Sequence, residues 1–203
     1  MATCLKGRII ESEEKLGREI LAAGFGRRAE NGVELNALEA AFLCERKIIE
    51  VHEGKKTLEV QEIYSKFDFG KKPKTGAMKK MVSKEKKSTK DAPKNTEMKT
   101  VLAEKITSEK LYLIYRALRF AGNVVRFSSG SPLMWRIYAK GVGREHERPQ
   151  SILRIVDKDW QASLESLERE LSVARLLRLE LVLGYFKDNK PCLIKVSKPP
   201  IEV

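Results

Sequence analysis

The residues best suited to chemistry lie in one stretch, WRIYAKGVGREHERPQSILRIV, at positions 135–156. Tyr138 ends a segment with strand-like alternation, and a glycine-containing loop with several cations and His146 follows it. A phenol beside cations and a histidine suits attack on a phosphodiester, because that reaction needs a base, an acid and a positive charge for the phosphorane. A tyrosine at a strand end is also often a half-buried packing residue with a polar tip. Both interpretations stay open at this point.

The cations around Tyr138 are the candidate contacts to an anionic substrate. Period-two alternation over residues 133–139 places Tyr138 on the same face as Arg136 and opposite the apolar Trp135. We therefore take as binding candidates Arg136, Lys140, Arg144, His146, Arg148 and Arg178.

No common catalytic motif accompanies this stretch. The sequence has no phosphate-binding glycine loop, dinucleotide fingerprint, zinc-protease helix or serine-hydrolase elbow. Its two histidines are too few for a histidine-rich metal site. We expect no metal ion and no small-molecule cofactor.

Charge favours a polyanionic partner, most simply RNA or DNA. The chain of 203 residues carries a net charge of +12. Residues 71–99 hold eleven lysines against three acids and almost no apolar side chains. Such a segment cannot offset its ordering entropy by burial, which predicts a flexible basic linker that could also attract phosphates. The chain is divided accordingly at 1–69, 70–99 and 100–203.

The first part reads as a small mixed α/β domain. We expect strands over 5–11 and 48–54, and helices over 12–24, 37–47 and 59–67. Asn31-Gly32 is typical of a hairpin turn, and Asn36 with Glu39 three residues later predicts a capping box.

The last part reads as a second mixed α/β domain with one helix on each face of a sheet. Helices are expected over 108–122, capped by Thr107 or Ser108, and over 160–177, with Leu164, Leu167, Leu171 and Ala174 buried. The predicted strands are 123–129, 133–139, 151–157, 179–186 and 190–197.

Cysteine usage and hydropathy indicate a cytoplasmic protein. Three widely spaced cysteines argue for free thiols in a reducing compartment. No apolar run is long enough to cross a membrane, and the N-terminus lacks the pattern of a signal peptide.

Two segments, AGFGRRAENGVELNALEAAFLCERKIIEV at 23–51 and YRALRFAGNVVRFSSGSPLMWRIYAKG at 115–141, resemble the tRNA-splicing endonucleases of the archaeal type. The order of a glycine-bounded segment, a helix, strands and an Ile-Tyr before glycine carries the resemblance. It implies a nuclease-like C-terminal α/β domain and metal-independent cleavage of precursor tRNA at bulge-helix-bulge junctions, leaving 2′,3′-cyclic phosphate and 5′-hydroxyl ends.

The family's three catalytic positions are only partly kept. Its tyrosine falls on Tyr138. Its histidine, placed before the next strand, falls on Arg148. Its lysine, in an Ala-x-x-Val-Arg-Lys pattern, falls on Leu179, while Ala174 and Arg178 match that pattern. The resemblance therefore implies a structural subunit that keeps the fold and lacks the catalytic histidine and lysine.

Such a subunit would join a catalytic subunit in an α2β2 heterotetramer that binds precursor tRNA. Two alternatives are an active homo-oligomeric enzyme using Tyr138, His146 and Arg178, and an unrelated basic RNA-binding module. Family members pair through C-terminal strands and a docking loop between them. The matching residues here are Leu193 and Ile194 in the strand and Asp188 in the loop.

Overall fold

The computed structural model describes most of both predicted domains. The lysine-rich segment predicted at 70–99 lies outside the described residues, as do Lys140, Arg144 and His146. The described ranges are 2–5, 8–66, 106–128, 131–139, 148–157 and 160–197, without the side chains of Leu5 and Pro132.

The N-terminal domain is a six-stranded mixed sheet with three helices. Its strands are β1 (Ala2–Leu5), β2 (Arg8–Glu11), β3 (Arg27–Ala29), β4 (Gly32–Leu35), β5 (Val51–Glu53) and β6 (Lys56–Thr57), in the order β3-β4-β2-β1-β5-β6. Its helices are α1 (Glu14–Ala22), α2 (Ala37–Glu45) and α3 (Val60–Ser65). The single strand predicted at 5–11 is wrong: β1 and β2 are two antiparallel strands, and β1 also pairs in parallel with β5.

The predicted start of α2 is confirmed in atomic detail. Asn36 Oδ1 accepts hydrogen bonds from the backbone N–H groups of Leu38 and Glu39 at 2.9 and 3.0 Å. The Glu39 carboxylate accepts from the Asn36 N–H at 3.0 Å, which completes the capping box. Most of α2 is buried, because it packs against α3 and β2 of its own domain and against α5 of the C-terminal domain.

The C-terminal domain is a five-stranded mixed sheet between two helices. Its strands are β7 (Val124–Ser128), β8 (Ser131–Tyr138), β9 (Pro149–Ile155), β10 (Glu180–Lys187) and β11 (Lys190–Val196), in the order β11-β10-β9-β8-β7, with only β9 and β10 parallel. The helices are α5 (Ser108–Phe120), whose Thr107 cap is confirmed, and α6 (Leu164–Leu176).

The two helices lie on opposite faces of this sheet, as predicted. Gly184 of β10 is directed toward Ile114 of α5. Arg154 of β9, on the other face, forms an ion pair with Glu170 of α6. The expected buried stripe of α6 is only partly correct, because Ala174 is buried whereas Leu164, at the first position of the helix, is 75% exposed.

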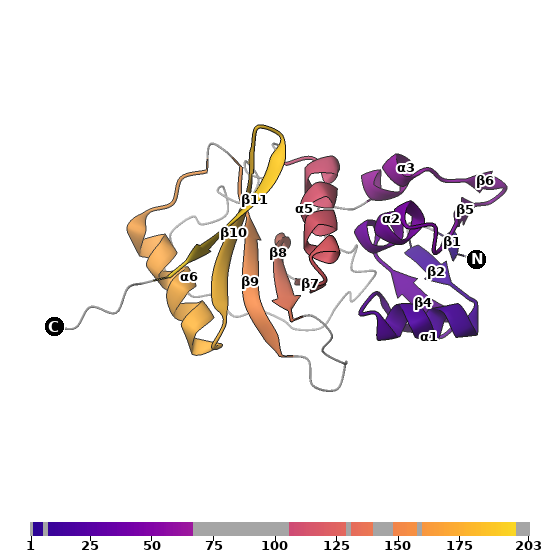
Figure 1. The fold of residues 1–203 in the computed structure, drawn as a ribbon, viewed down its shortest axis with the longest axis horizontal. Helices are drawn as coiled ribbons and strands as arrows, with labels where there is room; N and C mark the ends of the chain where they lie inside the picture. The colour runs from indigo at the N-terminus through magenta and orange to yellow at the C-terminus, as the bar shows by residue number, and fades with distance from the viewer. Residues whose placement is uncertain are drawn as a thin grey trace, which may run out of the picture.

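Helix α5 belongs to two interfaces at once. It lies between the C-terminal sheet and helices α2 and α3 of the N-terminal domain (Figure 1). Rings stack across the boundary, with Tyr64 and Tyr112 centroids 5.1 Å apart and Phe42 edge-on to Tyr115 at 6.1 Å. Glu45 accepts hydrogen bonds from the Tyr112 hydroxyl and from Arg116 Nε, the latter at 2.7 Å. Within the described residues, the two domains therefore form one packed unit.

Glu39 is the polar centre of this boundary. It is almost fully buried, and its carboxylate also accepts a hydrogen bond from the Gly26 N–H at 3.1 Å. Burial raises the pKa of Glu39, against the opposing effects of the two backbone donors and of the positive charges of Arg126 and Arg119.

None of the helices in the described ranges combines the length and apolar character that a membrane crossing needs.

Replacing Glu39 with alanine should lower the free energy of unfolding by about 3 kcal/mol, because two buried N–H groups lose their acceptor. Replacing it with glutamine should change the pH dependence. A carboxyl whose pKa is higher in the folded than in the unfolded state weakens the fold as pH rises from its ordinary pKa of about 4.3 through the raised value. Denaturant unfolding from pH 4 to pH 8 should show that slope in the native chain and not in Glu39→Gln. Equal slopes would contradict this prediction.

Candidate functional site

The strand register brings the three family-derived positions to one end of the C-terminal sheet. Tyr138, the last residue of β8, pairs with Pro149, the first residue of β9. Arg148 immediately precedes Pro149. In the parallel pair, Glu180 at the start of β10 lies opposite Ser151. Leu179, just before Glu180, is therefore near the same end of the sheet as Tyr138 and Arg148.

Tyr138 is more buried than a residue at the mouth of a loop would be. Only 8% of it is exposed, which is typical of a packing residue rather than of a phenol open to a substrate. The β8–β9 register shifts between Ile137 and Tyr138, so the strand carries an irregularity where the tyrosine lies. Tyr138 is outside the main apolar cluster, whereas Trp135 and Ile137 of the same strand belong to it. The opposite-face prediction for Tyr138 and Trp135 is consistent with this arrangement.

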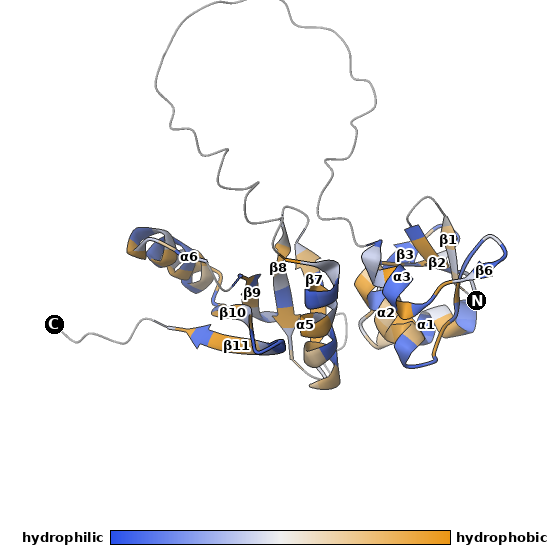
Figure 2. Ribbon diagram, turned by 90° about the horizontal axis from the view of Figure 1, so that it is seen from above, coloured by the Kyte–Doolittle hydropathy of each residue, from blue (hydrophilic) through white to orange (hydrophobic). Residues whose placement is uncertain are grey.

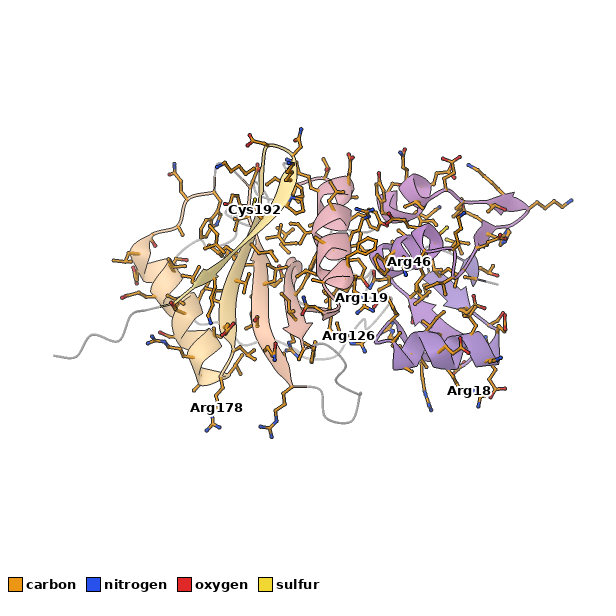
Figure 3. All side chains as sticks on the ribbon, in the orientation of Figure 1. Arg18, Arg46, Arg119, Arg126, Arg178 and Cys192 are labelled. Carbon is orange, nitrogen blue, oxygen red and sulfur yellow. The ribbon has the colours of Figure 1, made fainter. Side chains whose placement is uncertain are left out.

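The end of α6 fixes the backbone at Leu179, the position that corresponds to the family's catalytic lysine. The Leu179 N–H donates to Ala174 O and the Arg178 N–H to Arg175 O, both at 2.8 Å. Arg178 takes a left-handed conformation with φ of 56° and is exposed, and its side chain points away from the sheet in Figure 3. The position equivalent to the lysine thus carries the hydrocarbon side chain of Leu179.

The chemistry available at this end follows from the side chains described there. Tyr138 offers a phenol, and Arg148 and Arg178 offer exposed guanidinium groups. A guanidinium keeps its proton throughout the physiological range and cannot serve as a general acid. His146 lies outside the described residues, so its distance from Tyr138 is not part of this geometry. No group of three or more His, Cys, Asp or Glu residues in the described ranges is arranged to hold a metal ion.

Arg136 lies in a distinctly cationic part of the same sheet face. It is exposed, and its cross-strand partner on β7 is Arg126. Like charges directly opposite each other in antiparallel strands repel. Arg126 NH1 donates to Gly26 O at 3.0 Å, which directs that guanidinium toward the N-terminal domain. Arg136 therefore stays a candidate contact to an anion, whereas its cross-strand partner Arg126 is engaged at the domain boundary.

The last strand provides a possible assembly surface. β11 is an edge of the sheet, and its Leu193 and Ile194 are 45% and 49% exposed. In Figure 2 the strand lies at the outer side of the domain, with apolar residues along it. Asp188 and Asn189 both have positive φ and form a tight two-residue turn between β10 and β11, as the sequence predicted.

A group of cations at the domain boundary was not predicted from the sequence. Arg119 donates to Ala23 O at 2.9 Å and lies over the Phe25 ring at 3.7 Å. Figure 3 shows it with Arg46 and Arg126 where the two domains meet. A basic residue on an otherwise apolar helix or strand is the only local signal for such contacts, and it does not identify the partner.

Comparison with known families assigns the N-terminal part of the chain. Residues 2–64 match the family model described as tRNA intron endonuclease, N-terminal domain. This range runs from β1 into α3 and does not include the sheet that carries Tyr138. A search of curated proteins found no match. Residues 2–64 are therefore similar to the N-terminal domain of tRNA-intron endonucleases, in agreement with the resemblance seen in the sequence.

Proposed function

We propose that the chain is the non-catalytic, structural subunit of a tRNA-splicing endonuclease. With a catalytic subunit it forms an α2β2 complex that cuts precursor tRNA at bulge-helix-bulge junctions, leaving 2′,3′-cyclic phosphate and 5′-hydroxyl ends. The observation that carries the proposal is the set of side chains at one end of the C-terminal sheet, where Tyr138 is accompanied by Arg148 and Leu179.

The physical argument concerns what these side chains lack. Cleavage needs proton transfer to the departing 5′-oxygen and a cation for the phosphorane. Arg148 cannot release a proton near neutral pH, and Leu179 carries no charge. Burial of Tyr138 also limits the approach of a ribose hydroxyl to its phenol. The proposal therefore assigns the chemistry to the partner and gives this chain a role in assembly and RNA binding.

Assembly is the second part of the proposal. Members of the family are generally oligomeric, and the exposed apolar residues of β11 suit pairing with another strand. The complex is placed in the cytoplasm, which agrees with the three free thiols of the chain. Reconstitution with a catalytic subunit, followed by cleavage of a bulge-helix-bulge RNA, tests the proposal.

Tyr138→Phe should leave the cleavage rate of the reconstituted complex within about twofold of the unmodified complex, because the positions of the family's histidine and lysine carry Arg148 and Leu179. The same change at the catalytic tyrosine of the partner subunit should reduce the rate about 10²- to 10⁴-fold and serves as the control. Single-turnover kinetics on a labelled RNA measure both. A large drop caused by Tyr138→Phe in an intact complex would show that this chain performs chemistry.

A further inference from the structure

An exposed aromatic ring flanked by two guanidinium groups lies at the boundary between the domains. Phe120, the last residue of α5, is 50% exposed. The Cζ atoms of Arg116 and Arg46 lie 4.9 and 5.7 Å from its ring centroid, and Phe42 supports it edge-on at 5.4 Å. Arg46 comes from the end of α2 and the other two from α5, so both domains contribute. We call Arg46, Arg116 and Phe120 the boundary platform.

The two arginines of the platform differ in their electrostatic partners. Arg116 Nε donates to both oxygens of Glu45, at 2.7 and 2.9 Å, so much of its charge is balanced. Arg46 is exposed and forms no ion pair with any carboxylate in the described part of the chain. Stacking on a ring occupies the face of a guanidinium and leaves its N–H donors free at the edge. Arg46 therefore presents an unneutralised, preorientated fork of donors to solvent.

Packing alone does not account for the platform. A ring placed only to fill the core would be covered, as Phe42 is, with 7% exposed. Half of Phe120 instead faces solvent. An aromatic face beside an available guanidinium is the combination that binds nucleic-acid strands, through base stacking and phosphate contact.

We propose that the boundary platform is an RNA-binding site, distinct from the end of the sheet that carries Tyr138. Arg46 contacts a backbone phosphate, and the exposed part of Phe120 packs against an unpaired base. The net charge of +12 favours a polyanion over a protein surface as the occupant. The inference rests on the proposed function, in which RNA is the substrate of the assembled complex.

The test is a binding titration of a fluorescein-labelled bulge-helix-bulge RNA with the full chain. Fluorescence anisotropy measures the affinity at several KCl concentrations. Arg46→Ala should weaken binding and reduce the slope of log K against log salt by about 0.7 to 0.9, the loss of one phosphate contact. Phe120→Ala should weaken binding about 5- to 100-fold with the slope nearly unchanged, because stacking is not ionic. Arg46→Lys should keep the slope.

Arg18→Ala is the matched control. Arg18 lies on α1 away from the domain boundary, its side chain is 70% exposed, and its Glu14 pair at 3.4 Å is of the weak surface type (Figure 3). It should bind like the unmodified chain. Because Phe120 also contacts Phe42, a Phe120→Leu variant and thermal unfolding separate loss of the ring from loss of the fold.

Three results would overturn the inference. They are unchanged affinity and slope in both Arg46→Ala and Phe120→Ala, an equal slope change in Arg18→Ala, and loss of co-purification with the catalytic subunit at unchanged RNA binding. The last would identify the platform as a protein contact. Failure of the proposed function gives a different result from failure of this inference. In that case the chain binds RNA through the platform but neither assembles with a catalytic subunit nor supports cleavage.

Discussion

Purified alone, the chain should leave a bulge-helix-bulge RNA uncut, at a rate at least about 10⁴-fold below that of the reconstituted complex. General acid catalysis contributes roughly 10²- to 10⁴-fold, and a positioned charge on the developing anion roughly another 10²- to 10³-fold. The positions where the family supplies these groups carry Arg148 and Leu179. The measurement is single-turnover cleavage of end-labelled RNA, with and without the catalytic subunit.

His146→Ala is the variant that makes this experiment discriminating. In the proposed function His146 performs no chemistry, so the variant should support cleavage by the complex as well as the unmodified chain does. Robust cleavage by the isolated chain that disappears in His146→Ala would refute the structural-subunit assignment. It would instead favour an active enzyme that uses Tyr138, His146 and Arg178.

The second large effect is expected at the edge strand β11. Charging both apolar residues, as Leu193→Asp with Ile194→Asp, should abolish co-purification with the catalytic subunit. Leu193 lies opposite Gly184 and on the α5 side of the sheet, whereas Ile194 lies opposite Leu183 on the other side. The two changes therefore place a carboxylate on each face of a paired strand, where an unpaired buried charge costs several kcal/mol.

Ile48→Asp provides a control of matched exposure. Ile48 is 44% exposed, compared with 45% and 49% for the two β11 residues, but it lies in the N-terminal domain. It should not affect co-purification. Asp188→Lys, in the exposed turn before β11, should weaken higher assembly less than the strand variants do. Light scattering on the subunit mixture measures the mass of the assembly formed by each variant. An intact tetramer with both strand positions charged would rule out β11 as the interface.

Local interactions explain which features the sequence predicted well. The capping box of α2 needs only Asn36 and Glu39, which are three residues apart. The β3–β4 hairpin also forms where the sequence predicts one, but its two-residue turn is Glu30-Asn31 rather than Asn31-Gly32, and Gly32 begins β4. Pairing between distant segments leaves no such signal. The pairing of β1 with β5, nearly fifty residues later, has no local signal, and neither has the second role of Glu39, which depends on Gly26.

At the candidate site, too, local patterns were predicted well and features that depend on tertiary packing were not. Alternation predicts that Tyr138 lies opposite the Trp135 face, and the absence of Tyr138 from the main apolar cluster is consistent with this. The family pattern placed Arg148 and Leu179 at ends of elements that the sheet register brings together. The extent of burial of Tyr138 could not be predicted, because it depends on tertiary packing at the point where the β8–β9 register shifts. The exposure of Leu164 was missed because helical spacing does not show where the sheet beneath a helix ends.

The stacking of Tyr64 on Tyr112 has a consequence for the continuity of the chain. These residues lie close to the two ends of the segment that joins the domains, and the folded parts hold them 5.1 Å apart between ring centroids. Cleavage of the peptide backbone there would leave two fragments that associate through α5. The contacts of α5 with the N-terminal domain would then hold the two fragments together in place of the covalent connection, as in fragment complementation.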